Sequence, residues 1–310
     1  MEICWNPSEP QAWEAFHAAQ LGSLQQSWAY GNAMKALGVR VHRALVQDAD
    51  QVVGLAQFVG RRLMGYLSVA SCSRGPVWSP QVSAAERNTL MRQMQKALPL
   101  RPLRVVLWSP EQLESTLPAQ ERQGFFRVMT GYSTAWVDLS RSTEALRESM
   151  DGNWRNRLTK AQGQSGLRVS VEPSMPMCEW LLEREGEQRV SRGFHGLPTG
   201  FVPTYIAAFA TRPEAFVVAS AKYSGQTIAA MLFLLHGSVA SYHIGWSNDE
   251  GRRLNAHNLL LWRGIEALKA KGLRALDLGG VNTRDLAGIS RFKIGSGGQV
   301  NTLAGTFFRP

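Results

Sequence analysis

The sequence contains few cysteines and no long apolar segment. Its three cysteines, Cys4, Cys72 and Cys178, lie far apart, without CxxC spacing or the cysteine and histidine spacing of a zinc site. No stretch approaches the roughly 18 uninterrupted apolar residues that cross a bilayer. The opening residues MEICWNPSEP also lack the basic and apolar regions of an export signal. We therefore expect a cytoplasmic protein without disulfides or bound metal.

Several common catalytic patterns are missing as well. The chain has no P-loop and no Ser/His/Asp or Cys/His arrangement at recognisable spacing. A direct transfer reaction, without a covalent intermediate on the enzyme, fits this absence. No long charged heptad segment is present, so a coiled-coil arm is not expected.

Length and charge suggest two domains and an anionic ligand. The chain has 310 residues, of which 44% are apolar and 19% charged, as in an ordinary globular protein. Because this is about twice the usual length of a single domain, two domains are the default expectation. The net charge of +10 attracts phosphates of nucleotides, nucleic acid or anionic lipid headgroups. A solvated basic surface explains this charge almost as well, since the excess is spread over both halves of the chain.

One order of secondary structure is predicted twice. Near the C-terminus, three strand-like runs, a helix and a short apolar strand occupy residues 215–223, 227–237, 238–246, 255–271 and 273–280. The same order occurs earlier, at residues 41–48, 52–60, 63–71, 84–97 and 103–108. A hairpin, a strand, a helix and a parallel strand in this order resemble the core of GNAT acyltransferases. We expect an α/β fold with mixed sheets, built from two tandem GNAT-like domains.

Helical segments precede each predicted core, at residues 10–21 and 26–37 and again at 176–190 and 202–210. A strand and a helix connect the two copies. The apolar stripe of this helix consists of Leu146, Met150, Trp154, Leu158 and Ala161. The boundary is expected near residues 140–143, which gives an N-terminal domain of residues 1–143 and a C-terminal domain of residues 144–310.

The start of the predicted main helix of the second copy departs from the acetyl-CoA pattern. GNAT enzymes have an Arg/Gln-x-x-Gly-x-Gly/Ala turn there, because backbone N–H groups must approach the pyrophosphate. The equivalent stretch is GRRLNAH at residues 251–257, in which Asn255 and His257 occupy the places of small residues. This pattern argues against coenzyme A in its usual mode. Asn255 is also expected to cap the helix, and Gly272 to end it.

Four stretches resemble the FemABX family of peptidoglycan-bridge aminoacyltransferases, which have two GNAT-like domains and take their donor from aminoacyl-tRNA. They are QSWAY at 26–30 with Lys35, SRGP at 73–76, RNRLTKA at 155–161, and LDLGG at 276–280 followed by RFKIGSGG at 291–298. Each pattern is weak alone. In this order, on a double GNAT framework, they are fairly specific.

The resemblance implies that Phe292 and Lys293 belong to the catalytic site. A fixed ammonium beside an aminoacyl ester can stabilise a developing oxyanion or hold the terminal phosphate of tRNA. The alternatives are a solvated strand lysine for Lys293 and a core aromatic residue for Phe292. Asp277, which closes a predicted strand, is a third catalytic candidate that accepts a proton from the amine or orients it. Its alternative is a carboxylate that caps nearby backbone N–H groups.

Substrate-binding candidates come from three other segments. Lys35 matches a family position that contacts the diphosphate of a nucleotide- or lipid-linked acceptor, and Arg192 is a second candidate for the same group. Both have the alternative of an exposed surface cation. Tyr242 and His243 are neighbours on a predicted strand, so they point to opposite faces and at most one lines the cleft. Tyr242 is the substrate-binding candidate of this pair.

The linking helix carries the candidates for tRNA binding. Arg155, Arg157 and Lys160 flank its apolar stripe, where they can meet tRNA phosphates. The alternative is a solvated helix face, and Gly152 in the interior leaves the continuity of this helix open.

The sequence thus leads to an aminoacyltransferase that moves an aminoacyl group from aminoacyl-tRNA to an amine acceptor, such as a peptidoglycan precursor or a related metabolite. It would need no cofactor beyond its co-substrate and no metal. A peripheral contact with the inner membrane surface is compatible with its basic charge and with a lipid-linked acceptor. An N-acyltransferase that uses acyl-CoA or acyl carrier protein is the alternative, and a non-enzymatic binding protein is a third interpretation.

Overall fold

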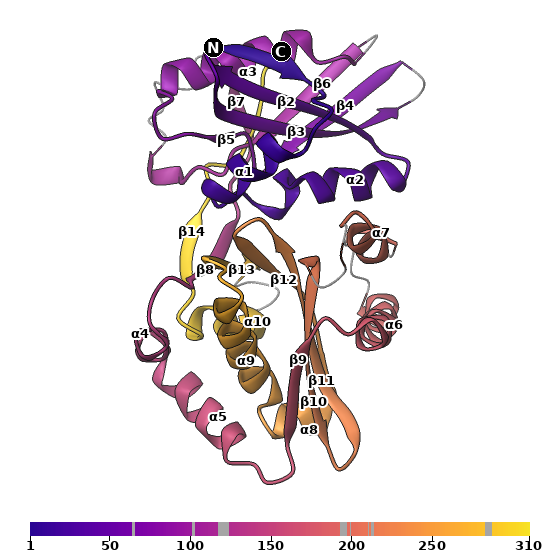
Figure 1. Cartoon of the computed structure of the whole chain (residues 1–310), viewed down its shortest axis with the longest axis vertical. Coiled ribbons are helices and arrows are strands. Elements are labelled where there is room, and N and C mark those ends of the chain that lie inside the picture. The colour runs from indigo at the N-terminus through magenta and orange to yellow at the C-terminus, as the bar shows by residue number, and fades with distance from the viewer. Residues whose placement is uncertain are drawn as a thin grey trace. The chain divides into compact units, whose positions relative to one another are not determined.

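The computed structural model describes residues 1–63, 66–100, 103–116, 124–192, 197–198, 200–209, 211, 214–282 and 287–310. The chain divides into two compact units, shown in Figure 1. Unit 1 comprises Met1–Tyr132 together with Thr302–Pro310, and unit 2 comprises Ser133–Asn301. This division differs from the predicted boundary at residues 143/144 for two reasons. The strand Ser133–Asp138 pairs within unit 2, and the last residues of the chain return to unit 1.

Unit 1 is a mixed sheet with helices on both faces. Its described elements are β1 (Glu2–Trp5), α1 (Gln11–Ala19), α2 (Trp28–Ala36), β2 (Arg40–Asp48), β3 (Gln51–Leu63), β4 (Leu67–Ser73), β5 (Val77–Trp78), α3 (Ala84–Ala97), β6 (Leu103–Ser109), β7 (Phe126–Met129) and β15 (Thr306–Phe308). The strand order is β1-β2-β3-β4-β6-β15-β7, and β5 pairs with β3. The C-terminal strand β15 therefore lies between β6 and β7. The start of the predicted strand 63–71 falls partly outside the described residues.

Alternation along the strands of unit 1 builds a core on each face of the sheet. Leu45 packs in a cluster with Trp13 of α1, whereas its neighbour Val46 belongs to the opposite cluster under α3. In the α3 cluster, Trp108 meets Phe58 edge to face, with ring centroids 5.2 Å apart. Neighbouring apolar residues of β2 are thus covered by helices on opposite faces of the sheet.

Two of the motif stretches meet in this unit. Gln26, which is fully buried, donates from Nε2 to the Ser73 carbonyl at 2.8 Å and accepts from the Gln57 N–H at 2.7 Å. A Cβ at Gly75 would lie 2.4 Å from the Gln26 side chain, so only glycine fits there. Ser27 caps α2 by accepting from the Tyr30 N–H. Both patterns therefore have a structural reason in addition to any chemical one.

A buried arginine fixes α2 on the sheet. Arg43 is 3% exposed and donates to the Trp28 carbonyl at 2.8 Å, to Asn32 Oδ1 at 3.0 Å and to Gln57 Oε1 at 2.8 Å. Its guanidinium also stacks 3.7 Å from the centroid of the Trp28 ring. Burial lowers the pKa of Arg43 to about 10, and the charge of Glu14 opposes this shift. Because Nη2 donates to two successive turns of α2 while Nε donates to Gln57 of β3, Arg43 holds this helix in register on the sheet.

We predict that His17 makes unit 1 sensitive to acid. The imidazole is 2% exposed, its Nε2 lies 2.9 Å from the Ser23 carbonyl, and burial lowers its pKa to about 4. Between pH 6.5 and pH 4 the unfolded chain therefore binds a proton at His17 that the folded unit does not bind. The free energy of unfolding should fall as the pH is lowered through this range, by at most about 3 kcal/mol from this group.

Urea unfolding at pH 7 and pH 4.5, in wild type and in His17→Gln, measures this contribution. The variant should lose less stability than wild type between the two pH values, because the glutamine does not titrate. An equal loss in both proteins would contradict the prediction.

Unit 2 has one larger mixed sheet. Its described elements are β8 (Ser133–Asp138), α4 (Thr143–Glu148), α5 (Gly152–Gln162), β9 (Arg168–Glu172), α6 (Met175–Arg192), α7 (Phe201–Ala207), β10 (Phe216–Tyr223), β11 (Gln226–His236), β12 (Val239–Ser247), α8 (Asp249–Arg253), α9 (Ala256–Ala270), β13 (Ala275–Val281), α10 (Ala287–Gly295) and β14 (Gln299–Thr302). The strand order is β14-β8-β13-β12-β11-β10-β9. α6 and α7 cover one face, while α5, α9 and α10 lie on the other (Figure 1).

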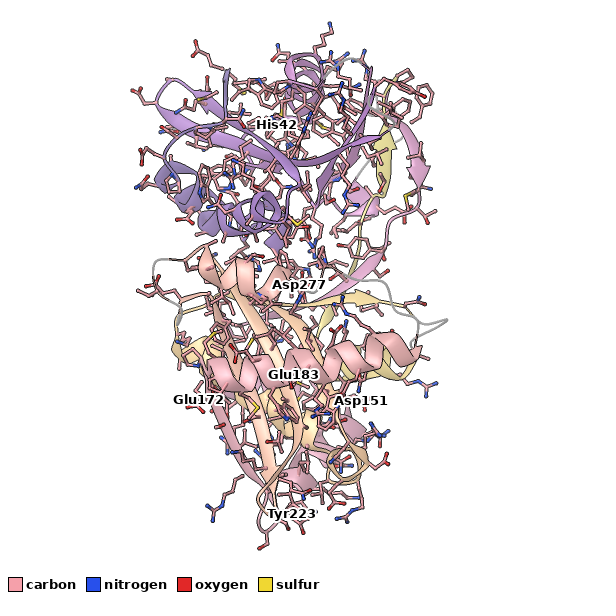
Figure 2. The ribbon with its side chains drawn as sticks, turned by 90° about the vertical axis from the view of Figure 1, so that its right-hand side faces the viewer. His42, Asp151, Glu172, Glu183, Tyr223 and Asp277 are labelled. Atoms are coloured by element: carbon pink, nitrogen blue, oxygen red, sulfur yellow. The ribbon has the colours of Figure 1, made fainter. Side chains whose placement is uncertain are left out.

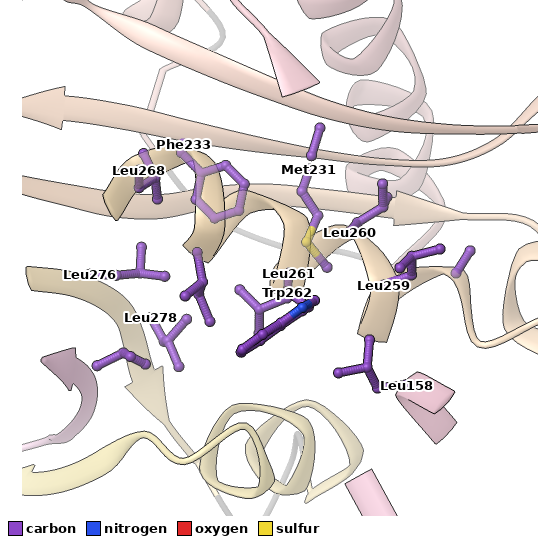
Figure 3. Packing of buried hydrophobic residues seen from close by; sticks show 14 of the residues in the cluster. Leu158, Met231, Phe233, Leu259, Leu260, Leu261, Trp262, Leu268, Leu276 and Leu278 are labelled. Carbon is purple, nitrogen blue, oxygen red and sulfur yellow. The ribbon is translucent and has the colours of Figure 1, made fainter. Parts of the chain in front are cut away.

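The core of unit 2 lies between the sheet and α9. Leu260, Leu261 and Leu268 of α9 are fully buried against Met231 and Phe233 of β11, as Figure 3 shows. A Cβ at Gly264 would lie 2.8 Å from the Phe233 ring, so this glycine lets the helix approach the sheet closely. The predicted strands and main helix of the second copy are confirmed, with ends that differ by one or two residues.

The predicted ends of α9 fare differently. Gly272 has φ +81°, the Gly272 N–H donates to the Lys269 carbonyl, and the Leu273 N–H donates to the Leu268 carbonyl. These bonds form a Schellman motif, so the predicted stop is confirmed. Asn255 stands at the N-cap position, but it has φ 53° and its side chain makes no capping bond. Asn255 therefore occupies the predicted N-cap position, but its side chain does not cap the helix.

The linking helix is divided in two. α4 ends at Glu148, and α5 begins at Gly152 after Asp151, whose carboxylate accepts from the N–H groups of Asn153 and Trp154. The continuity of the linking helix, which Gly152 left open in the sequence, is therefore broken between Glu148 and Gly152. The apolar stripe persists because Leu146, Met150, Trp154, Leu158 and Ala161 all remain buried. Among the described residues, no helix is long and apolar enough to span a membrane.

Candidate functional site

The parallel strands β12 and β13 separate in the middle of unit 2. They pair over only three positions, from Val239 with Ala275 to Ser241 with Asp277. Both strands continue beyond this point, β12 to Ser247 and β13 to Val281. The parallel pair of unit 1, β4 with β6, is instead paired over seven positions from Leu67 to Ser73. An opening between parallel strands is therefore a feature of unit 2.

A β-bulge accompanies the separation. Phe233 of β11 pairs with Tyr242, but Leu232 pairs with Ile244, which leaves His243 as the extra residue of β12. Tyr242 lies 6.0 Å from the Phe233 ring on the α9 side, whereas His243 lies 5.9 Å from the Phe201 ring of α7. The prediction that Tyr242 and His243 face opposite sides is confirmed.

Lys293 lies at the opening between the two strands. It is 9% exposed, and its Nζ donates to the Gly280 carbonyl of β13 at 2.9 Å. The same ammonium lies 5.8 Å from the centroid of the Tyr242 ring of β12. The expected alternative of a solvated strand lysine is wrong, because Lys293 is on helix α10 and buried. Desolvation lowers the pKa of Lys293, and the charge of Asp277 opposes this shift.

Asp277 occupies the last position at which β12 and β13 still pair. Figure 2 labels it on β13. The carboxylate is 3% exposed, and its Oδ1 accepts from Thr134 Oγ1 at 2.9 Å and from the Gly279 N–H at 2.8 Å. It thus fixes the turn of backbone that leads to Gly280 and supplies a negative charge that favours the ammonium of Lys293.

Glycines lie beside the ammonium of Lys293 and beside its backbone carbonyl group. Gly279 has φ +76°, and a Cβ there would lie 3.6 Å from Lys293 Nζ. A Cβ at Gly298 would lie 2.9 Å from the Lys293 carbonyl oxygen. The glycine pairs of the two motif stretches therefore allow β13 and the segment after α10 to close on the lysine.

Tyr242 forms the wall of the opening on the β12 side. Burial raises the pKa of its phenol to about 12, so the group stays neutral at physiological pH. A Cβ at Gly245 would lie 2.0 Å from the Tyr242 hydroxyl, so Gly245 leaves space for this side chain. A neutral ring face beside an ammonium suits a site that keeps a cation partly desolvated.

Phe292 belongs to a row of rings beside the site. It is half-buried, with ring centroids 5.9 Å from Trp154 and 6.1 Å from His257. Trp154 Nε1 donates to the Phe292 carbonyl at 3.0 Å. The sequence pattern presents Trp154 as a core residue and does not single it out for the site. The signal that could have found it is the indole N–H, which needs a partner when buried.

The start of α9 is packed against the sheet. The His257 ring bonds through Nε2 to the Trp246 carbonyl at 2.9 Å, and burial lowers its pKa. A Cβ at Gly251 would lie 2.4 Å from the Ile228 carbonyl oxygen. The segment that resembles a coenzyme loop therefore leads through α8 and a left-handed Asn255 into α9.

The other predicted residues lie elsewhere. Lys35 is exposed on α2 in unit 1, and burial together with the charge of Arg43 lowers its pKa. Arg192 ends α6, and its side chain lies outside the described residues. Arg155, Arg157 and Lys160 lie on α5, where Arg155 donates to the Glu148 carbonyl at 3.0 Å. Unit 2 thus brings together Lys293, Phe292, Asp277 and Tyr242, and leaves the others at separate places.

Residues 148–293 match the family model of the acetyltransferase (GNAT) domain. This match lies within unit 2 and includes the separated strands and Lys293. Unit 2 therefore contains a GNAT domain, and the protein is an acyltransferase. No curated protein matches the chain.

Several solved structures share the fold of this chain. The crystal structure of FemX covers 99% of this chain and 97% of its own, with a TM-score of 0.82 and 16% sequence identity. The structure of L-PGS from Bacillus licheniformis matches with a TM-score of 0.55 and 14% identity, over 97% of this chain and 91% of that chain. A tandem GNAT protein from the clavulanic acid biosynthesis pathway matches with a TM-score of 0.52 and 12% identity, over 99% of this chain and 98% of that chain. The predicted FemABX-like double GNAT fold is confirmed.

Proposed function

We propose that this acyltransferase moves an aminoacyl group from aminoacyl-tRNA to an amine acceptor, such as a peptidoglycan precursor or a related metabolite. The observation that carries the proposal is the buried ammonium of Lys293, held by the Gly280 carbonyl where β12 and β13 separate. An acyl carbonyl bound in this opening would lie beside a fixed positive charge. Such a charge lowers the energy of the oxyanion that forms during acyl transfer.

The proposed reaction needs no covalent intermediate on the protein. The amine nitrogen of the acceptor attacks the ester carbonyl of the aminoacyl-tRNA, so that a C–N bond forms and the C–O bond to the terminal ribose breaks. The ribose oxygen takes up a proton, and the amine nitrogen loses one. An ammonium has three N–H donors, and Gly280 accepts one of them from Lys293. The oxyanion can therefore be bound while the lysine keeps its anchor on β13.

The start of α9 supports tRNA rather than coenzyme A as the donor. Asn255 and His257 stand where a pyrophosphate-binding turn has small residues, and α8 runs directly into this point. The exposed cations of α5, which include Arg157 and Lys160, are available for RNA phosphates. The similarity to a GNAT acetyltransferase domain favours the second candidate, an N-acyltransferase that uses acyl-CoA or acyl carrier protein.

The acceptor is proposed to be anionic as well as amine-bearing. Lys35, which is exposed on α2 of unit 1, is a proposed contact for its diphosphate. Arg192 at the end of α6 is a separate candidate for the same group. Diphosphate oxygens linked to a nucleotide or a lipid suit a cation of either kind.

The test is incubation of the purified protein with charged tRNA pools and candidate amine acceptors, followed by mass spectrometry of the products. We expect transfer that disappears when the aminoacyl ester is hydrolysed beforehand. Transfer that survives removal of RNA and requires acyl-CoA would support the second candidate instead. The absence of transfer from any acyl donor would refute both.

A further inference from the structure

The C-terminal end of α10 carries Lys293, and its hydrogen bonds show what holds it in place. The last four carbonyl groups of a helix have no partner within the helix. In α10 these groups belong to Phe292, Lys293, Ile294 and Gly295. Two of them are satisfied locally. Ser296 Oγ donates to the Lys293 carbonyl at 2.7 Å, and the Gly297 N–H donates to the Ile294 carbonyl at 3.1 Å.

The other two carbonyls are satisfied by the start of α5, which is more than a hundred residues earlier in the chain. Trp154 Nε1 donates to the Phe292 carbonyl at 3.0 Å, and the Asp151 N–H donates to the Gly295 carbonyl at 2.9 Å. The two donors thus bind the carbonyl of Phe292, which directly precedes Lys293, and the carbonyl of Gly295, two residues after it. Figure 2 labels Asp151 in unit 2.

Packing fixes the same corner. The Trp154 ring lies 5.9 Å from the Phe292 ring, and a Cβ at Gly295 would lie 3.1 Å from the Trp154 ring. A Cβ at Gly297 would lie 2.5 Å from Ser149 Oγ. The glycines after Lys293 therefore allow α10 to dock on the corner between α4 and α5, and the indole is the centre of that contact.

We infer that Trp154 is a positioning residue for Lys293. It holds the backbone of α10 by its N–H donor and by its ring, so that the lysine ammonium reaches the Gly280 carbonyl and the opening between β12 and β13. The helix that begins with this brace is also the one that presents Arg155, Arg157 and Lys160. The consequence for catalysis rests on the proposed function, whereas the brace itself can be tested without it.

The first measurement is the chemical reactivity of Lys293, which does not depend on any acyl-transfer activity. Purified protein is treated with acetic anhydride over a range of pH, and acetylation at Lys293 is followed by mass spectrometry. In Trp154→Phe, the N–H donor is lost and most of the ring remains, so the lysine should become less fixed and label at least about threefold faster. Trp262→Phe is the matched control, because Trp262 is buried on α9 in the same core.

A second variant separates the hydrogen bond from packing. Replacing Trp154 by benzothienylalanine keeps a bicyclic ring of similar volume and removes only the N–H donor. We expect faster labelling of Lys293 here too, with a melting temperature close to that of wild type. Unchanged labelling in both folded Trp154 variants, or an equal increase in Trp262→Phe, would overturn the inference.

The second measurement applies to transfer. With aminoacyl-tRNA, kcat should fall about tenfold in Trp154→Phe while KM for the acceptor stays unchanged, because a misplaced catalytic group affects the chemical step. If wild type shows no transfer at all, the proposed function fails and the labelling result still decides the role of Trp154. If transfer occurs and kcat is unaffected by Trp154→Phe, the positioning role fails and the proposed function stands.

Discussion

Replacing Lys293 by alanine should lower the rate of transfer by about a hundredfold or more. The substitution removes the ammonium that lies between Gly280 of β13 and the Tyr242 ring of β12, where the two strands separate. An oxyanion in this opening would then lose its positive partner in a poorly solvated place near the negative charge of Asp277. Because the charge acts mainly on the transition state, kcat should fall more than KM rises.

Two further variants make the Lys293 result specific. Lys293→Arg keeps a charge but replaces the compact ammonium between the Gly280 carbonyl and the Tyr242 ring by a larger planar fork, so it should restore little activity. Lys269→Ala is the matched control. Lys269 lies in the last turn of α9, away from the opening, and its Nζ also donates to a backbone carbonyl, that of Leu139 at 2.9 Å. Equal rates for wild type and Lys293→Ala would remove Lys293 from the mechanism.

Replacing Phe307 by alanine should destabilise unit 1 by about 3–5 kcal/mol. Phe307 is 4% exposed in strand β15, where it packs in the cluster that contains Trp108, Phe125 and the buried face of α3. Its backbone pairs with Trp108 of β6 and Arg127 of β7. The loss of the ring leaves a cavity in the middle of the sheet, next to the largest aromatic residues of this unit.

Thermal or urea unfolding followed by the tryptophan signal measures this loss. Phe308→Ala is the control. The Phe308 side chain points to the other face of β15 and is only half-buried, so its removal should lower the free energy of unfolding clearly less. A deletion of residues 302–310 should have the larger effect of separating β6 from β7 and exposing unit 1 to protease. Equal stability of wild type and Phe307→Ala would contradict the prediction.

Local patterns in the sequence were sufficient for most strands and helices. The apolar run within residues 41–48 and the helical spacing in residues 255–271 predicted a strand and a helix, and both elements are present in the structure. The repeated order of these elements then predicted the double GNAT fold. Gly272 could be assigned as the stop of α9 because the residue just after a helix often adopts a left-handed backbone conformation, which glycine adopts without strain.

Long-range pairing could not be predicted in the same way. Nothing local in residues 306–308 shows that they lie between β6 and β7, which precede them by more than 170 residues. The break at Asp151 depends on the capping bonds of its carboxylate and on the Gly295 carbonyl, which the helical stripe of apolar residues conceals. The burial of Lys293 likewise depends on three separate segments, so the sequence left a solvated strand lysine as the alternative to a site residue.

The place of β15 also affects how the chain is made. During translation, most of unit 1 leaves the ribosome first, but its sheet stays incomplete until β15 (Thr306–Phe308) has been added. The intervening residues 133–301 require on the order of 10 to 30 s at roughly 5–20 residues per second. Throughout this interval β6 is an open edge with Trp108 beside it, so the nascent chain is exposed to aggregation or to capture by chaperones at that edge.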